Sequence, residues 1–162
     1  MLIAIIADTH MPKGSRELPP QCVERLRAAE LILHAGDIST AGVLAELGRL
    51  GPPVLAVHGN VDEPTLVESL PAQLEVELDG VRLAMTHDVG SAQGRLARLR
   101  KRFDRADAVV FGHSHIPLLD ALEGFQIFNP GSPTERRRQP QRTMGLARIA
   151  GGRIVFEHVA LG

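Results

Sequence analysis

The sequence predicts an α/β (α+β) fold in which two mixed β-sheets pack together and helices cover their outer faces. Residues 2–57 alternate strand-like apolar runs with helical segments, which predicts parallel strands joined by right-handed crossovers. Residues 73–158 contain short apolar or alternating runs separated by Gly-containing turns, which predicts further strands and hairpins. Together these segments predict about ten strands and three or four helices.

The first half begins with a continuous apolar run rich in Ile over 2–7, typical of a strand buried on both faces. Pro20 fits the first turn of a helix, and Thr40 is a suitable N-cap for another. The later elements predicted in this half are a helix over 20–30, a strand over 31–35, a helix over 42–50 and a strand over 54–57.

The second half begins with a predicted hairpin. Residues 73–78 alternate apolar and polar side chains, Asp79-Gly80 forms a turn, and 81–85 returns as the partner strand. The remaining predicted elements are a basic helix over 92–105 and strands over 108–111, 118–121, 126–128, 145–149 and 154–158.

The composition indicates one globular domain spanning residues 1–162, with 44% hydrophobic and 23% charged residues. The net charge of −1 and the scarcity of aromatic residues give no reason to expect binding to nucleic acid or an anionic membrane. The run over 2–7 follows no basic segment, so we expect neither a signal peptide nor a membrane span. The single cysteine, Cys22, fits a reducing compartment, and we expect a cytoplasmic protein.

Five apolar runs end in residues that bind metals. In three of them a Gly stands directly before the polar residue, where it permits a sharp turn and close approach of the backbone. The donors are Asp8 and His10 after the first run, Asp37, Asn60 and His87 after the next three, and His113 and His115 after the last. Because ligands bind beyond the carboxyl ends of strands in open α/β sheets, these donors can converge on one place.

The donors supply oxygen and nitrogen but no sulfur. This set disfavours structural zinc and suits Mn, Fe, Co or catalytic Zn. Seven donors exceed the needs of one ion with an open position, but they suffice for two ions sharing a carboxylate. Two ions about 3.5–4 Å apart can clamp a displacement at phosphorus and lower the pKa of a bound water from about 15.7 toward 7. Each motif is weak alone, since strand alternation also produces His-x-His.

Taken in order, these residues resemble the motif set of the calcineurin-like metallophosphoesterases. The matching segments are Asp8-x-His10, Gly36-Asp37, Gly59-Asn60-Val61-Asp62, His87 and Gly112-His113-Ser114-His115. The sequence Asn129-Pro130-Gly131-Ser132-Pro133 is similar to the compact bacterial and archaeal phosphodiesterase branch, whose fold the retromer subunit Vps29 shares. The resemblance implies a four-layer αββα sandwich over the whole chain.

The resemblance also implies two divalent ions, with Mn²⁺ favoured and Fe, Co, Ni or Zn as alternatives. One ion would be held by Asp8, His10, Asp37 and His115, and the other by Asp37, Asn60, His87 and His113. Asp37 would bridge them together with a hydroxide, the nucleophile for in-line attack on a small phosphodiester. Relatives in this family form dimers or larger assemblies, so a homo-oligomer is also expected.

Alternatives stay open beside this interpretation. A phosphomonoesterase would use the same residues, and a non-catalytic scaffold similar to Vps29 would use the same fold. Many relatives carry a His after the Asn as general acid, whereas Val61 stands here and cannot transfer a proton. Asp62 either orients a neighbouring group or begins a helix turn, and Ser114 either touches phosphate or only separates two histidines.

Several other polar residues have competing interpretations. His34, His58 and His158 fit structural roles within strands better than metal ligation. Asp88 fits a solvent-facing side chain. The arginines at 95, 98, 102 and 105 fit a solvated helix face, with a phosphate clamp as the alternative, and the arginines at 136–138 and 142 fit either a surface loop or substrate steering.

Overall fold

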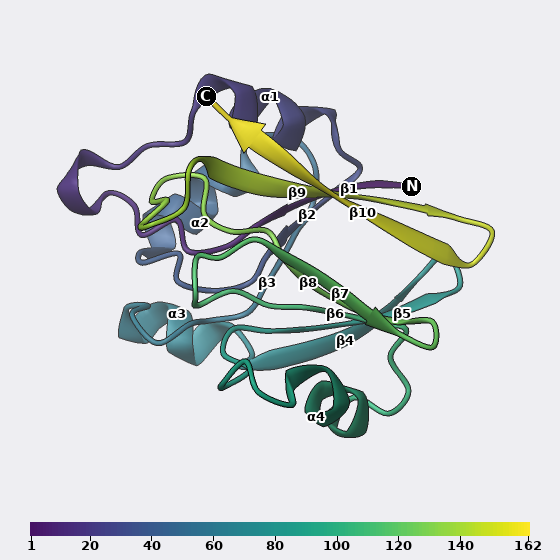
Figure 1. The fold of residues 1–162 in the computed structure, drawn as a ribbon. Coiled ribbons are helices and arrows are strands. Elements are labelled where there is room, and N and C mark those ends of the chain that lie inside the picture. The colour runs from purple at the N-terminus through teal and green to yellow at the C-terminus, as the bar shows by residue number, and fades with distance from the viewer.

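The computed structural model describes residues 1–162, which form two five-stranded sheets and four α-helices (Figure 1). The first sheet has the order β10-β9-β1-β2-β3, with β1 (Leu2–Ile6), β2 (Leu31–His34), β3 (Val54–Ala56), β9 (Arg142–Ala150) and β10 (Arg153–Leu161). The second sheet has the order β4-β5-β6-β8-β7, with β4 (Gln73–Leu78), β5 (Val81–Thr86), β6 (Ala108–Val110), β7 (Leu118–Leu122) and β8 (Phe125–Asn129). The helices are α1 (Pro20–Ala28), α2 (Ala41–Gly48), α3 (Pro64–Ser69) and α4 (Arg95–Arg102), with a 3-10 turn at Lys13–Ser15.

Each sheet is built around three parallel strands. In the first sheet β1, β2 and β3 are parallel, and the antiparallel pair β9 and β10 extends the β1 side. In the second sheet β5, β6 and β8 are parallel, and β4 and β7 close its two edges as antiparallel strands. The crossovers predicted for residues 2–57 therefore have their expected parallel arrangement, and both sheets are mixed.

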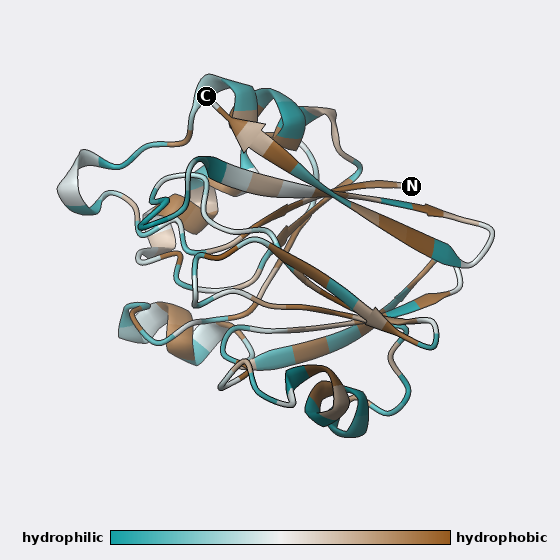
Figure 2. Ribbon diagram, viewed as in Figure 1, coloured by the Kyte–Doolittle hydropathy of each residue, from teal (hydrophilic) through white to brown (hydrophobic).

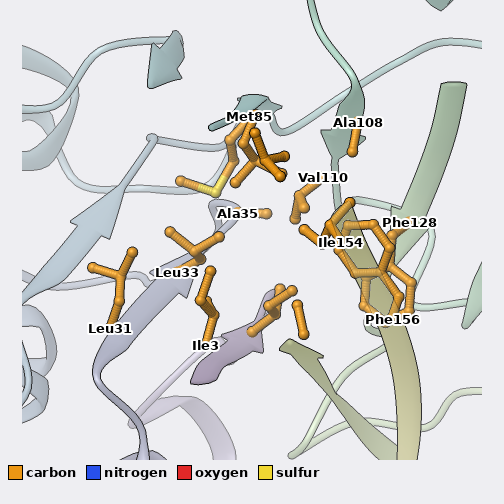
Figure 3. Packing of buried hydrophobic residues seen from close by; sticks show 14 of the residues in the cluster. Ile3, Leu31, Leu33, Ala35, Met85, Ala108, Val110, Phe128, Ile154 and Phe156 are labelled. Carbon is orange, nitrogen blue, oxygen red and sulfur yellow. The ribbon is translucent and has the colours of Figure 1, made fainter. Parts of the chain in front are cut away.

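The main core lies between the two sheets (Figure 3). Ile3 and Leu33 from the first sheet pack with Met85 and Val110 from the second, and all four are buried. Phe128 stacks on a further aromatic ring of β10, with the two centroids 4.6 Å apart. The core thus joins strands that lie far apart in the sequence.

The outer faces of both sheets are covered by helices. Ala4 and Ile6 of β1 point away from the central core and pack with Leu26 of α1 and Leu47 of α2. On the second sheet, Leu99 of α4 packs with buried residues of β5 and β6. Figure 2 shows mostly apolar strands in the centre and polar segments on α1 and α4. The predicted α/β class, two mixed sheets flanked by helices, is confirmed.

The predicted hairpins also form. Asp79 and Gly80 both have positive φ, 47° and 82°, as the tight turn between β4 and β5 requires. Most differences concern the ends of elements. The basic helix starts at Arg95 rather than residue 92, because Gly94 adopts a left-handed conformation with φ 65°. The C-terminal strands are longer than predicted, since β9 pairs along its whole length with β10. No helix combines the length and apolarity needed to cross a membrane.

Candidate metal centre

All seven donors predicted from the sequence lie just beyond the carboxyl ends of parallel strands. In the first sheet, β1 precedes Asp8 and His10, β2 precedes Asp37, and β3 precedes Asn60. In the second sheet, β5 precedes His87, and β6 precedes His113 and His115. The strands run toward the same side of the molecule, where their loops gather away from the labelled N-terminus (Figure 1).

One group of donors combines Asp8, His10 and His115, whose ligand atoms all lie within 4.8 Å of one another. The Nε2 atoms of His10 and His115 are 3.2 Å apart. Oδ1 of Asp8 is 3.6 Å from Nε2 of His115 and 3.9 Å from Nε2 of His10. A carboxylate and two imidazole nitrogens therefore point to one small volume.

The second group combines Asp37, His87 and His113, again with ligand atoms within 4.8 Å of one another. Asn60 joins this group through its side-chain oxygen. Oδ1 of Asn60 is 3.0 Å from Nε2 of His87 and 3.2 Å from Nδ1 of His113. The structure thus brings all four predicted donors of this group together.

Asp37 lies between the two groups. Its Oδ2 is 3.1 Å from Nε2 of His87 in one group and 3.7 Å from Nε2 of His10 in the other. Its other oxygen, Oδ1, accepts a hydrogen bond from the backbone N–H of Val61 at 3.0 Å. The carboxylate is therefore fixed with one oxygen facing both groups, which is the position a bridging ligand needs.

The backbone around the donors is strained in a way that few side chains tolerate. Asp8, His10, Asp37, His113 and His115 all have positive φ, between 47° and 72°. A non-glycine residue in this region costs of order 1–3 kcal/mol and persists only where the surroundings hold it. This concentration of strain at five of the seven donors indicates a site held in position by the fold rather than a set of surface loops.

Backbone carbonyls set the orientation of two histidines. Nδ1 of His87 donates to the carbonyl of Ala35 at 2.7 Å, and Nδ1 of His115 donates to the carbonyl of Glu135 at 3.2 Å. Because a carbonyl can only accept, each Nδ1 carries the proton. Nε2 is then the ring nitrogen that faces the cluster, as in histidines that bind metals.

Burial dominates the electrostatics of the cluster. It raises the pKa of Asp8 from 3.8 to about 7, even though His87 opposes this shift. Burial also lowers the pKa of His115 to about 4, assisted by the charge of Arg137. Burial likewise acts on Asp37, but the hydrogen bond and charge of His87 outweigh it, so the pKa of Asp37 lies below its ordinary value.

Two features of the cluster fit bound cations. Oδ2 of Asp8 is buried and has no hydrogen-bond partner in the protein, although such atoms are usually satisfied. A side chain at Gly59 would overlap Oδ1 of Asp37, and a Cβ at Gly36 would lie 2.6 Å from Nδ1 of His87. The glycines predicted to allow close approach therefore do so, and the donor set fits two divalent ions.

Asp62 holds the loops that carry the oxygen donors. Its carboxylate accepts backbone N–H bonds from Gly59 at 2.6 Å, Ser39 at 2.7 Å and Asp37 at 3.1 Å. Of its two sequence interpretations, this geometry corresponds to a group that orients its neighbours, while α3 begins two residues later at Pro64. Asp62 ties the loop after β2 to the loop after β3.

The loop that follows β8, noted in the sequence only for its resemblance over 129–133, supports the loops that carry the donors. Ser132 donates from Oγ to the carbonyl of Asp8 at 2.8 Å, and Thr134 donates to the carbonyl of Thr9 at 2.7 Å. Asn129 donates to the carbonyl of Gly112 at 2.9 Å. The signal was present in the sequence, because this polar loop also follows an apolar run that ends a parallel strand.

A sequence model of the calcineurin-like phosphoesterase superfamily domain matches residues 1–152. The chain belongs to this superfamily. A probable metallophosphoesterase of Methanothermobacter thermautotrophicus is 36% identical over 164 residues, which cover 100% of this chain and 94% of that protein. A phosphodiesterase of Methanocaldococcus jannaschii is 24% identical, with 81% of this chain and 83% of that protein covered.

Solved structures show the same fold. Vps29 of Entamoeba histolytica in complex with Zn²⁺ superposes with a TM-score of 0.78 at 22% identity, covering 99% of both chains. An archaeal phosphodiesterase superposes with a TM-score of 0.75 at 22% identity, covering 99% of this chain and 100% of that one. The expected metallophosphoesterase fold is thereby confirmed.

The remaining polar residues of this phosphoesterase fall mostly into structural positions. His34 is fully buried, and its ring nitrogens contact Thr9 at 3.0 Å and the backbone N–H of Gly36 at 3.2 Å. His158 contacts the carbonyl of Asn129 at 2.8 Å. The arginines of α4 contact the protein itself, since Arg98 donates to the backbone carbonyls of residues 89, 91 and 93. The structure therefore does not place them at the cluster.

Proposed function

We propose that this phosphoesterase hydrolyses a small phosphodiester with two divalent metal ions, preferably Mn²⁺, bound by the seven donors. The position of Asp37 between the two donor groups carries the proposal, because a single carboxylate oxygen faces both at 3.1 and 3.7 Å. Asp8, His10, Asp37 and His115 would hold one ion, and Asp37, Asn60, His87 and His113 the other. Fe, Co, Ni and Zn suit the same donors.

Bound ions would supply the hydroxide nucleophile and stabilise charge on the phosphoryl oxygens. The protein's own contribution is positioning. The carbonyl of Ala35 orients the ring of His87 so that Nε2 faces the cluster, and the N–H of Val61 fixes Asp37. Burial of Asp8, with no exposed surface, excludes water from its carboxylate and strengthens its attraction for a cation.

The proton for the leaving group has no evident donor in this chain. The side chain of Val61 is 48% exposed and occupies the position where many relatives have a general acid. A general acid contributes about 10²–10⁴-fold to rate. We therefore propose a preference for leaving groups of low pKa, which a comparison of nitrophenyl and alkyl esters at saturation would test. Equal rates for the two esters would refute it.

The experiment that tests the function is hydrolysis of bis(p-nitrophenyl) phosphate by chelator-treated protein during titration with Mn²⁺. Activity should be absent without metal and should appear with a dependence on metal that requires two ions. Parallel titrations with Co²⁺, Ni²⁺, Zn²⁺ and Fe²⁺ would rank the metals. p-Nitrophenyl phosphate, tested under the same conditions, separates a diesterase from a monoesterase.

Three outcomes have different meanings. Faster turnover of the diester supports the proposal, whereas faster turnover of the monoester replaces it with a phosphomonoesterase. A folded, metal-loaded protein that hydrolyses neither ester favours a protein-binding scaffold on the same fold. The folded state and metal content would be checked by circular dichroism and elemental analysis of the same sample.

The cellular location and the oligomeric state of the protein remain predictions. We propose a cytoplasmic location, because the only cysteine, Cys22, is a free and buried thiol whose pKa burial raises to about 12. Assembly of identical subunits is proposed on the resemblance to the family, and sedimentation would measure it.

A further inference from the structure

A pocket of about 390 Å³ opens beside the donor cluster. It is lined by Ser114, Ile116, Arg137, Arg138 and Gln139. Ser114 separates two of the proposed metal ligands in the sequence, so the pocket adjoins the loop that carries them. Four of its five lining residues carry a polar or charged side chain, which indicates a polar ligand rather than an apolar one.

The pocket contains two positive charges without protein partners. The guanidinium groups of Arg137 and Arg138 make no hydrogen bond or ion pair within the chain, and both residues are exposed. Their neighbours differ in this respect. Arg136 donates to the carbonyl of Gln139 at 2.7 Å, and Glu135 pairs with Arg16 at 3.2 Å. The nearest carboxylate in this segment is thus already engaged, and the two arginines are left to bind an anion.

Ser114 adds a neutral donor to the same pocket. Its Oγ accepts hydrogen bonds from the backbone N–H of Ile116 at 3.2 Å and from Nδ2 of Asn129 at 3.2 Å. Both bonds use the lone pairs of the oxygen, so the hydroxyl proton has no partner. The pocket therefore offers two guanidinium forks and one hydroxyl, which together match the oxygens of a phosphate.

A second pocket borders the donors Asn60 and His87 and has the opposite character. It measures about 260 Å³ and is lined by residues 58–60, 72 and 86–88, which include no Lys or Arg. Asp88 lies there with its Oδ2 3.9 Å from Nε2 of His113. An anion would be repelled by Asp88 and attracted by Arg137 and Arg138, so the two sides of the site can distinguish the two ends of a substrate.

We propose that Arg137 and Arg138 bind a second anionic group of the substrate, a phosphate separate from the phosphodiester held at the donor cluster. The preferred substrate is then a diester that also carries a phosphomonoester, as nucleoside bisphosphate derivatives do. This inference rests on the proposed function, since it names the class of substrate for that same site. Arg137 also lies close enough to the cluster for its charge to act on Asp8 and His115.

The test compares two chromogenic diesters that differ by one phosphate. They are the 5′-(p-nitrophenyl) ester of thymidine 5′-phosphate and the same ester with an additional 3′-phosphate. For the wild type with Mn²⁺, kcat/KM should be about 10-fold or more higher for the second ester, because each charge-assisted contact is strong. In Arg137→Gln/Arg138→Gln the ratio of the two kcat/KM values should fall toward one.

A matched control removes two charges from the opposite end of the molecule. Arg105 follows α4 and Arg153 begins β10, and neither makes a hydrogen bond or ion pair within the chain. Arg105→Gln/Arg153→Gln changes the net charge by the same amount and should keep the wild-type ratio. A ratio lowered equally in both double variants would overturn the proposal, because it would reflect net charge alone.

The outcomes separate this inference from the proposed function. Hydrolysis of both esters with equal kcat/KM by the wild type would keep the diesterase and overturn the anion pocket. If neither ester is hydrolysed, the proposed function fails, and calorimetry with Mn²⁺-loaded protein then decides about the pocket. Thymidine 3′,5′-bisphosphate should bind about 10-fold tighter than thymidine 5′-phosphate, and only in proteins that retain both arginines. Equal affinities would overturn the inference.

Discussion

The two sheets supply different chemistry to the same site. The first sheet contributes Asp8, Asp37 and Asn60, all oxygen donors, together with one histidine at position 10. The second sheet contributes only histidines, at positions 87, 113 and 115. The carboxyl groups thus lie on one half, and three of the four imidazole rings on the other. Neither half alone offers the mixed donor set that the proposed two-metal site needs.

Residues of each sheet also orient donors that belong to the other sheet. Ala35, which follows β2, accepts from the ring of His87, and the backbone N–H of His113 donates to Oδ1 of Asp8 at 3.2 Å. Ser132, which follows β8, bonds the carbonyl of Asp8. The orientation of the donors therefore depends on the packing of the two sheets, and we expect metal binding to report on that packing.

Replacing Asp37 by Asn should have the largest effect. The change removes the carboxylate proposed to bridge the two donor groups, so both proposed metal positions lose a ligand. We expect kcat to fall by about 10³-fold or more, as for other groups essential to catalysis. The measurement is diester hydrolysis under saturating Mn²⁺, with the stoichiometry of bound metal determined on the same protein. Turnover with two bound ions would contradict the bridging role.

Replacing Asp8 by Asn tests how the buried charge affects stability. In metal-free protein the pKa of Asp8 is raised from 3.8 to about 7 by burial, so its contribution to stability is present at low pH and lost as pH rises toward 7. Between pH 5 and pH 8 the free energy of unfolding of the wild type should fall by about 2–3 kcal/mol more than that of the variant. Urea unfolding at the two pH values would measure the difference.

Added Mn²⁺ should change the relative stability of the wild type and Asp8→Asn. The ion would stabilise the ionised Asp8 of the wild type and would find one ligand fewer in Asp8→Asn, so the wild type should become the more stable protein at pH 8. A variant whose stability changes with pH in parallel with the wild type would show that Asp8 does not titrate in this range.

Gly59→Ala should disturb the first-sheet donors alone. The added Cβ would overlap Oδ1 of Asp37 and lie 2.5 Å from its backbone nitrogen. Such overpacking costs about 1–3 kcal/mol, and the displaced carboxylate should weaken metal binding. Gly48→Ala is the matched control, because its Cβ would meet nothing within 4 Å, and it should be neutral or stabilise by up to about 1 kcal/mol. Equal effects of the two substitutions on the thermal unfolding temperature would argue against close packing of Gly59 on Asp37.

Much of this arrangement could be predicted from the sequence. The buried run over 2–6 and the alternating run over 73–78 identified strands in different environments, and Asp79-Gly80 identified a hairpin. Polar residues directly after apolar runs identified the seven donors, because parallel strands end at a common edge. These features depend on local periodicity, which a single sequence displays.

Other features depend on contacts between distant segments. The left-handed backbone of His10 and His115, the carbonyl of Glu135 that sets the tautomer of His115, and the orphaned Oδ2 of Asp8 all arise when the two sheets pack. Local sequence holds no record of these contacts. The helix α3 has only six residues and weak periodicity, so in the sequence a helix turn here was one of two interpretations of Asp62.

The smallest expected effect comes from the contact that ties the loop after β8 to the first sheet. Thr134 is half-buried and donates to the carbonyl of Thr9 at 2.7 Å, between two of the proposed ligands. Thr134→Val keeps the shape but removes this donor, and should cost about 1 kcal/mol of stability. Thr65→Val, at an exposed position of α3, should change the free energy of unfolding much less. A fall in Mn²⁺ affinity in Thr134→Val but not in Thr65→Val would show that the second sheet also supports the oxygen donors of the first sheet. An unchanged affinity would show that the second sheet contributes only its histidines.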